Sequence, residues 1–364
     1  MTQSQKQKNI GTTLSVLTIS LWLGVAQESC LAASAAKDNA KNAAPAAVSI
    51  NTPTPETLNT KKQLLDLTGG RRVKVVWNQG AAEKDMKLYL FDTKDGAIHE
   101  LPFAGSAPLI TIDGRRVYAS IGKAPAERVV KMFDTETGKT TELAKGPGNN
   151  LLAVWTDPKS RKDWVYVNNS GDKNESWNVP AGKVYRFPMD KPEVRELFWD
   201  RTSSHIYLMF SGDGTRACFE PSWSNIGQLK LEFDAQGKVD QEKSIYKQFG
   251  GGCFPSMAPD NSYRLFRLEG DHKAISMCDM DNTKPRKIDI TGMLTSAQKG
   301  RNTWLTRWST DPRYLTLIAP AGADAQIWMG RFDENITKIE TWVRVSPEKG
   351  PQCWQSQAWV EPKK

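Results

Sequence analysis

Two stretches of the chain are nearly identical. FDTKDGAIHEL begins at Phe91 and FDTETGKTTEL begins at Phe133, 42 positions later. Each has an aromatic residue and Asp at the end of a β-prone run, then a polar turn and a second β-prone run, which is the pattern of a hairpin. A supersecondary unit that recurs every 20–50 residues or so indicates a repeat architecture. The repeat therefore constrains the fold class more than any other feature.

The aromatic–Asp element recurs along the rest of the chain. Clear copies are LKLEFD and IWMGRFD, and degenerate copies are VYRFPMD and ISMCDMD. With the first two stretches this makes six copies, whose aspartates are Asp92, Asp134, Asp190, Asp234, Asp279 (with Asp281) and Asp333.

A second element, an Asp-Gly, Asp-Pro or Asp-Asn turn between two short β-prone runs, lies in the other half of each unit. Asp favours such turns because its side chain binds the backbone that follows it, and Gly or Asn tolerates positive φ. Each unit is therefore predicted to contain four strands: a, tight turn, b, loop, c, turn, d. The turn aspartates are Asp113, Asp157, Asp213, Asp260 and Asp311.

Four-stranded units with almost no helical periodicity predict a β-propeller. A single sheet cannot bury both of its faces, so it must pack against copies of itself. We predict an all-β fold, a six-bladed β-propeller of four-stranded blades. Seven blades is the alternative, if residues 151–199 contain an extra hairpin.

The two ends of the repeat predict how the ring closes. The first unit begins at strand b, Val73–Trp77, and CWQSQAWV, Cys353–Val360, is a strand with no b strand after it. A ring must avoid free sheet edges. We therefore expect the C-terminal strand to complete blade 1.

The N-terminus has the pattern of a secretory signal peptide. Lys6 and Lys8 precede an apolar stretch, Leu14–Ala26, and Ala33–Ala35 is an A-x-A cleavage site. The apolar stretch is too short for a comfortable membrane span. We expect a signal peptide over 1–35, an Ala/Pro/Thr/Asn-rich flexible linker over 36–62 and the propeller over 63–364. The mature protein is predicted to be exported, periplasmic or extracellular, with no membrane span.

Cys30 leaves a lipoprotein anchor as the less favoured alternative, because Gln27, Glu28 and Ser29 before it form a poor lipobox. If Cys30 is removed with the signal peptide, four cysteines remain. An even number in an exported chain predicts at least one disulfide, with the connectivity left open. These cysteines are Cys218, Cys253, Cys278 and Cys353.

Charge and motifs exclude several classes of function. The net charge of +8 is spread along the chain and mixed with acidic residues, so no nucleic-acid partner is expected. The cysteines lack metal-site spacing and the chain has 3 His, so neither a metal nor a cofactor is expected. GGGC at 250–253 precedes a strand and opens no helix, so it does not fit a nucleotide loop.

At Phe254–Asp281 the chain resembles the P-S-x-S-P-D-G repeat of TolB-like, WD40-like six-bladed propellers. The match is to Pro255, Ser256, Pro259 and Asp260, with Asn261 where Gly is usual. TRWSTDPRYLTLI, from Thr306, resembles a second copy. The resemblance implies the fold and a location in the cell envelope. The chain is also similar to the propeller halves of prolyl-oligopeptidase-like enzymes, but no hydrolase domain follows, so that activity is not expected.

We place the candidate site where long polar loops gather, at the d-to-a and b-to-c end of the blades. Loops held by a rigid scaffold commonly carry function. Trp304 is the main candidate, because its polar setting GRNTW does not resemble a strand interior, whereas Trp155, Trp308 and Trp359 fit strand cores. Aromatic rings beside Arg and His can stack on sugars or peptide side chains. The predicted ligand-binding residues are Trp304, Trp177, Trp223, His272 and Arg301.

The sequence favours an exported, non-enzymatic and monomeric propeller that binds a protein or glycan partner through this loop face. One alternative is a polysaccharide-degrading enzyme, a glycoside hydrolase or lyase. It would need two facing carboxylates, for which Asp172, Glu175 and Asp271 are the candidates. A structural component of the cell envelope is the other alternative.

Overall fold

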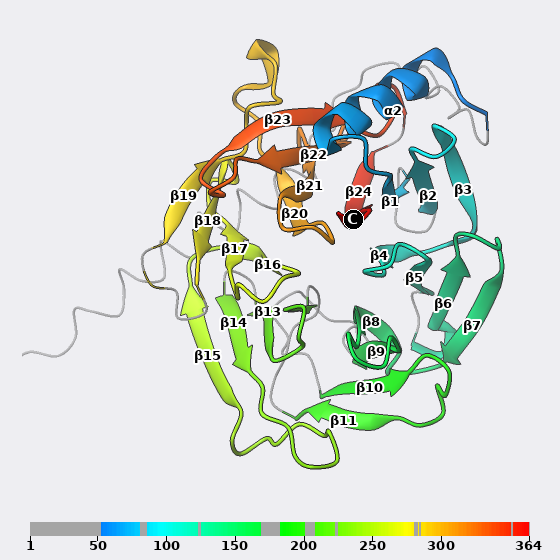
Figure 1. Ribbon diagram of the computed structural model, residues 1–364, viewed down its shortest axis with the longest axis vertical. Coiled ribbons are helices and arrows are strands. Elements are labelled where there is room, and N and C mark those ends of the chain that lie inside the picture. The colour runs from blue at the N-terminus through cyan, green and yellow to red at the C-terminus, as the bar shows by residue number, and fades with distance from the viewer. Residues whose placement is uncertain are drawn as a thin grey trace, which may run out of the picture. The chain divides into compact units, whose positions relative to one another are not determined.

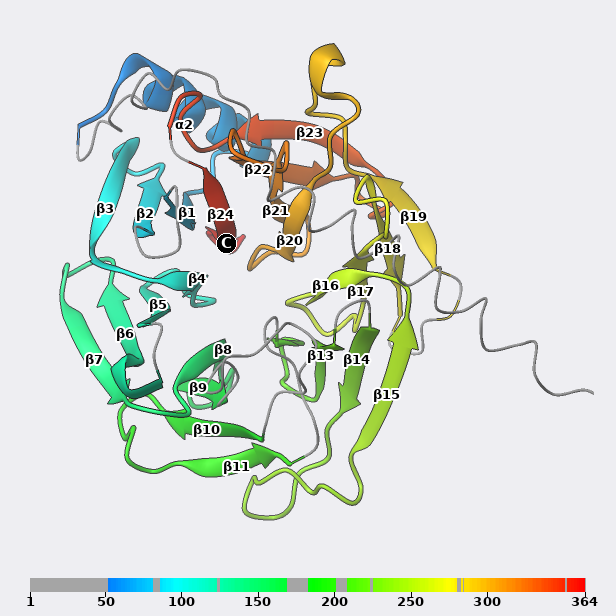
Figure 2. The ribbon, with the colours of Figure 1, turned by 180° about the vertical axis from the view of Figure 1, so that it is seen from behind.

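Strands arranged in a ring make up almost all of the described protein (Figures 1 and 2). The computed structural model describes residues 52–80, 86–122, 125–168, 183–200, 208–222, 225–279, 283, 285–350 and 352–363. These residues contain six sheets of four antiparallel strands each. The prediction of a six-bladed propeller with four-stranded blades is confirmed, and the alternative of seven blades is not.

Within each blade the strands follow one another from the channel outward in chain order, except that β24 precedes β1. Blade 1 has β24 (Cys353–Val360), β1 (Val73–Gln79), β2 (Lys87–Asp92) and β3 (Ala97–Ala104). Blade 2 has β4 (Ser106–Ile110), β5 (Arg116–Ile121), β6 (Val129–Asp134) and β7 (Thr140–Lys145). Blade 3 has β8 (Asn150–Thr156), β9 (Asp163–Asn168), β10 (Val184–Pro188) and β11 (Glu196–Trp199).

The other half of the ring repeats this order. Blade 4 has β12 (Met209–Phe210), β13 (Arg216–Ser222), β14 (Asn225–Lys230) and β15 (Ile245–Gly250). Blade 5 has β16 (Cys253–Met257), β17 (Leu265–Leu268), β18 (Ala274–Cys278) and β19 (Arg286–Asp289). Blade 6 has β20 (Trp304–Trp308), β21 (Tyr314–Ala319), β22 (Gln326–Phe332) and β23 (Ile339–Arg344). Two short 3₁₀ turns, Pro125–Glu127 and Ser296–Gln298, lie in loops.

The hydrophobic core lies between the blades rather than within them. One cluster joins blades 1 and 2 and includes Leu88, Val117 and Trp359. Similar clusters join blades 2 and 3, 3 and 4, and 4 and 5, and the largest spans blades 5, 6 and 1. A blade therefore buries its faces only when its neighbours are present, which is why the sequence must repeat.

The ring closes as predicted, through β24. β24 pairs antiparallel with β1, and Val360 lies opposite Val73. We call this junction of β24 with β1 the seam. The Arg71 guanidinium strengthens the seam, because its Nη1 lies 2.6 Å from Asp311 Oδ2 in blade 6 and donates to the Glu361 carbonyl at 3.0 Å. The two ends of the propeller thus hold each other and blade 6 together.

A helix that the sequence did not suggest, α2 (Pro55–Thr68), packs against blades 1 and 6 near this seam (Figure 1). Thr54 caps its N-terminus in a capping box, and Gly69 ends it at φ 68°. Leu64 and Leu67 are buried in the largest core cluster. The helix begins inside the range predicted as linker, while the predicted signal peptide and Cys30 lie outside the described residues.

Candidate functional site

The turns from strand a to strand b contain the aspartates that the sequence singled out. In each turn the Asp side chain accepts a hydrogen bond from the backbone N–H two residues later, so the predicted turn chemistry is confirmed. The acceptor–donor pairs are Asp113–Arg115, Asp157–Lys159, Asp213–Thr215, Asp260–Ser262 and Asp311–Arg313.

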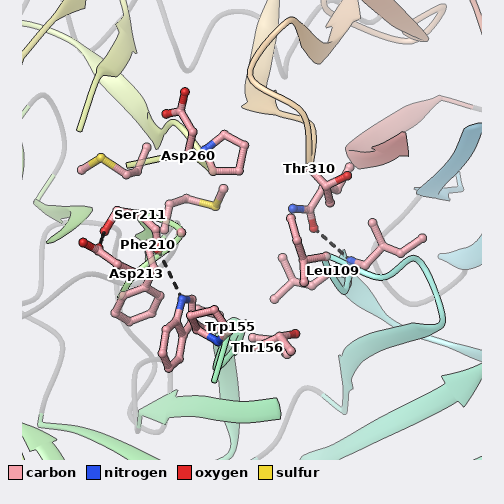
Figure 3. Close-up of a pocket in the computed structure, with 18 of the residues that line it drawn as sticks. Leu109, Trp155, Thr156, Phe210, Ser211, Asp213, Asp260 and Thr310 are labelled. Atoms are coloured by element: carbon pink, nitrogen blue, oxygen red, sulfur yellow. Dashed lines mark hydrogen bonds between the residues drawn. The ribbon is translucent and has the colours of Figure 1, made fainter. Parts of the chain in front are cut away.

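A cavity of about 470 Å³ lies at the end of the channel where these turns gather (Figure 3). Each blade contributes to it through its innermost strand or the turn that follows. The lining includes Leu109 of β4, Trp155 of β8, Phe210 of β12, Met257 of β16, Thr310 after β20 and Gln357 of β24. A volume in this range is typical of a small-ligand or side-chain pocket.

Most of the cavity wall presents apolar atoms, because its polar atoms already bind the protein. The Thr156 hydroxyl donates to Asp163 at 2.7 Å, and the Thr310 hydroxyl accepts from the Val360 N–H at 3.1 Å. The Gln357 amide oxygen accepts from the N–H of Ile110 in blade 2 at 2.9 Å. These polar side chains hold the rim together and leave few groups for a polar ligand.

Asp213 lines the cavity with its carboxylate fully engaged. One oxygen accepts from the Ser211 hydroxyl at 2.6 Å and the Thr215 N–H at 3.0 Å, and the other accepts from the Tyr263 hydroxyl at 2.7 Å. Burial alone would raise the pKa of Asp213, but these hydrogen bonds outweigh it and hold the pKa below its ordinary value. This carboxylate is an ionised structural group.

Trp155 forms one wall and also joins two blades. Its indole N–H donates to the Ser211 carbonyl of blade 4 at 3.2 Å, and its ring lies tilted against Phe210 at a centroid distance of 6.4 Å. The sequence predicts Trp155 to be a strand-core residue. The structure places it at the edge of the core, half-buried, with part of its ring facing the cavity.

No known protein-family profile and no curated protein sequence matches the chain. Solved structures do resemble it. TolB from Acinetobacter baumannii superposes with a TM-score of 0.55 at 11% identity, covering 83% of this chain and 71% of that one. A chain from a nidogen–laminin complex superposes with a TM-score of 0.53 at 9% identity, covering 79% and 98%.

The fold is that of a TolB-like six-bladed propeller. The resemblance seen in the sequence at Phe254–Asp281 is therefore confirmed as a resemblance of fold. At sequence identities this low, the similarity shows that the fold is shared and does not show what the protein does.

In this TolB-like propeller, the predicted site residues that the structure describes, Trp304, His272 and Arg301, lie toward the opposite end of the channel from the cavity. Trp304 is the first residue of β20, whereas Ser309 and Thr310, which line the cavity, follow its last residue. Each residue of a strand advances the chain by about 3.3 Å, so the two ends are roughly 16 Å apart along β20. The innermost strands run in the same direction, so this separation holds around the ring.

The structure brings two of the predicted residues, Trp304 and His272, into contact, whereas Arg301 binds elsewhere. The Trp304 and His272 rings meet edge to face at 6.3 Å, and the Thr303 N–H donates to the His272 carbonyl at 2.9 Å. Arg301 is held by two hydrogen bonds to Asp324, at 2.6 and 2.5 Å. The other two, Trp177 and Trp223, lie outside the described residues.

His272 and Trp304 pack more deeply than expected for a ligand face. His272 is 4% exposed, and burial lowers its pKa, although Asp271 opposes the shift. Its Nε2 lies 3.5 Å from Cys253 Sγ. Trp304 is half-buried, and its indole N–H is shielded from solvent. This cluster joins blades 5 and 6.

The prediction of a disulfide is wrong in this structure. Cys218, Cys253, Cys278 and Cys353 are buried, and no disulfide joins any of these four described residues. Cys253 and Cys353 begin the innermost strands of blades 5 and 1, with blade 6 between them. Burial raises the pKa of Cys278 to about 11 and that of Cys353 to about 12. These two thiols are therefore protonated near neutral pH and unreactive.

Within the described parts of the chain, no three His, Cys, Asp or Glu side chains are grouped to hold a metal ion. In the same parts, no helix has the length and apolar character needed to cross a membrane. Of the carboxylates considered for an enzyme, Asp271 faces Lys287 at 3.5 Å on the surface, and Asp172 and Glu175 lie outside the described residues.

Proposed function

We propose that this propeller is a binding module and that the cavity at the a-to-b turn end of its channel receives an apolar segment of a protein partner. The observation that carries the proposal is the cavity itself. It is built by all six blades, and its wall is mostly apolar, with the Thr156 and Thr310 hydroxyls and the Gln357 amide oxygen bonded within the protein.

The wall favours a protein partner over a glycan. A sugar presents hydroxyl groups in every direction and needs many hydrogen bonds from its site. The Thr156 and Thr310 hydroxyls and the Gln357 amide oxygen are already bonded within the protein. An apolar side chain needs only contact area, and burying one contributes about 1.5–3 kcal/mol. One of the similar structures comes from a protein–protein complex, nidogen with laminin, which supports a protein partner.

The carboxylates at the cavity argue against the enzyme alternative. A general acid or nucleophile needs a free oxygen aimed at the substrate. Asp213 instead accepts four hydrogen bonds, three from Ser211 and Thr215 and one from Tyr263. Oδ1 of Asp260 accepts two from Ser262, and its Oδ2 lies 3.8 Å from Arg264. We propose a role in binding, with export to the envelope as the signal-peptide pattern of the sequence suggests.

Chemical-shift mapping tests the proposal. Amide-capped hexapeptides with two or three consecutive apolar residues would be titrated into the ¹⁵N-labelled mature protein, with the indole N–H of Trp155 as the reporter. We expect saturable shifts of Trp155 and of backbone signals in the a-to-b turns. If no apolar peptide moves these signals at millimolar concentration, the proposed site is wrong.

The loop face predicted from the sequence is tested in the same titration. Shifts confined to Trp304 and His272 would place binding at that end of the channel. Turnover of a polysaccharide that is lost in Asp271→Asn would favour the enzyme alternative instead.

A further inference from the structure

Three residues that line the cavity carry a charge: Arg161, Asp213 and Asp260. Both carboxylates are used inside the protein. Asp213 binds its own turn and Tyr263. Asp260 accepts the N–H and the hydroxyl of Ser262, and lies 3.8 Å from Arg264. Both Ser262 hydrogen bonds fall on Oδ1 of Asp260, and its Oδ2 faces the Arg264 guanidinium, so each carboxylate already has a partner within the protein.

Arg161 differs from both. It is exposed, and within the described chain its guanidinium makes no hydrogen bond or ion pair. Other arginines of the a-to-b turns and the seam are paired: Arg115 binds Asp134 at 3.0 Å and Arg71 binds Asp311 at 2.6 Å. Even its neighbour Lys162 lies 3.4 Å from Asp190. Arg161 is therefore the one cation of the described lining, and no acidic side chain of the described chain holds it.

The backbone holds Arg161 at the rim in a conformation that L-residues avoid. Its φ is 59°, and its N–H closes the turn by donating to the Asp157 carbonyl at 2.8 Å. In the corresponding turns of blades 2 and 4, glycines take the left-handed positions, Gly114 at φ 68° and Gly214 at φ 72°. A side chain at such a position strains the turn. Tyr263 takes the same conformation in the blade 5 turn, at φ 55°, but its hydroxyl donates to Asp213, whereas the Arg161 side chain has no such partner among the described residues.

We infer that the partner presents a carboxylate beside its apolar residue and that Arg161 binds this carboxylate. The planar guanidinium can donate two parallel hydrogen bonds to one carboxylate, a geometry that a lysine cannot reproduce. The apolar residue would enter the cavity, while the carboxylate would stay at the exposed rim, where removing water from the charged groups costs little. This inference rests on the proposed function, since it names the chemistry of the segment that the cavity receives.

The carboxylate has two sources, a chain terminus and an acidic side chain. Three synthetic peptides separate them: acetyl-GSGLF with a free C-terminus, the same peptide as its carboxamide, and acetyl-GSGLFE as its carboxamide. Calorimetry or the Trp155 shift gives each affinity. We expect at least one carboxylate peptide to bind about tenfold more tightly than the neutral peptide, and the tighter of the two identifies the source.

Three variants test whether Arg161 causes the preference for a carboxylate peptide. Arg161→Gln should abolish the preference for a carboxylate, because a neutral amide cannot pair with it, and Arg161→Lys should keep only part of that preference. Lys159→Gln is the matched control, a cation of the same turn that does not line the cavity, and should keep the preference in full.

The outcomes separate the inference from the proposed function. Equal binding of all three peptides to the unmodified protein would overturn the carboxylate inference and leave the cavity as a binding site. A preference that survives in Arg161→Gln would overturn the role of Arg161. Failure of every peptide to bind would overturn both the inference and the proposed function.

Discussion

The indole N–H of Trp155 in blade 3 donates a hydrogen bond of 3.2 Å to the carbonyl oxygen of Ser211 in blade 4. A β-carbon on Gly214, in the same turn, would lie 2.5 Å from the Trp155 ring. Blades 1 and 2 repeat this arrangement, since Trp359 donates to the Ile112 carbonyl at 3.0 Å and covers Gly114. The glycine of an Asp-Gly turn thus permits the turn and also admits the tryptophan of the preceding blade.

Gly214→Ala is expected to lower the free energy of unfolding by about 3 kcal/mol, from strain at positive φ and from the clash with Trp155. Gly138→Ala is the matched control, because Gly138 has the same φ of 72° and nothing within 4 Å of an added β-carbon. The control should cost only about 1 kcal/mol. Equal losses in urea unfolding would show that the tryptophan contact contributes nothing.

The turns were predictable because their chemistry is local. An Asp followed by Gly, Pro or Asn determines its own hydrogen bonds, as at Asp113 and Asp260, and the spacing of such turns gave the blade count. The packing of a tryptophan on the next blade was not predictable, because Trp155 and Gly214 are brought together only by the ring.

Gln228→Met is expected to stabilise the protein by about 1–2 kcal/mol. Gln228 in β14 is 2% exposed, and among the described residues neither atom of its amide group has a hydrogen-bond partner. A buried amide without partners is unfavourable, and Met of similar length removes that cost. Gln241→Met is the control, because Gln241 donates to the Phe198 carbonyl at 2.8 Å, and should be destabilising. A lower melting temperature for Gln228→Met would contradict the prediction.

His272 should make stability fall in mild acid. Burial lowers its pKa from the ordinary value of 6.5, so the folded protein keeps it neutral where the unfolded chain already binds a proton. Its contribution to stability is therefore present above pH 6.5 and is lost as the pH falls from there towards the folded pKa.

His272→Asn tests this, since Asn tolerates the φ of 55° found at this position. The difference in stability between pH 7.5 and pH 5.5 should be smaller in the variant than in the unmodified protein. The same pH difference in both proteins would mean that His272 titrates normally.

Removing Cys353–Lys364 should destabilise the whole propeller. The truncation deletes β24, exposes the edge of β1 and removes Cys353, Ala358 and Val360 from the largest core cluster. We expect a melting temperature at least ten degrees lower by circular dichroism, or no cooperative transition. Melting within a degree or two of the full chain would show that β24 does not close the ring.

The candidate site was much less predictable than the fold. Loop length is visible in a sequence, and it directed attention to Trp304 and Arg301. The cavity is built instead from residues as distant as Leu109 and Gln357, each in a strand that looks like ordinary core. Only the positive φ of Arg161 and the absence of a partner for its side chain mark a functional position there, and neither can be read from a sequence. Helix α2 was missed because its four leucines give no clear helical period, and only two of them, Leu64 and Leu67, are buried.

The central claim is that the partner binds at the a-to-b turn end of the channel. The most direct test is the affinity of the best-binding hexapeptide for three variants, measured by calorimetry. Ile112 lines the cavity mouth and is 37% exposed, so Ile112→Gln should fold normally and weaken binding about fivefold or more, through lost apolar contact. Leu58→Gln, at an exposed site on α2, and Trp304→Ala, at the other end of the channel, should leave the affinity unchanged. Full affinity in Ile112→Gln together with a large loss in Trp304→Ala would contradict the claim and move the site to the loop face.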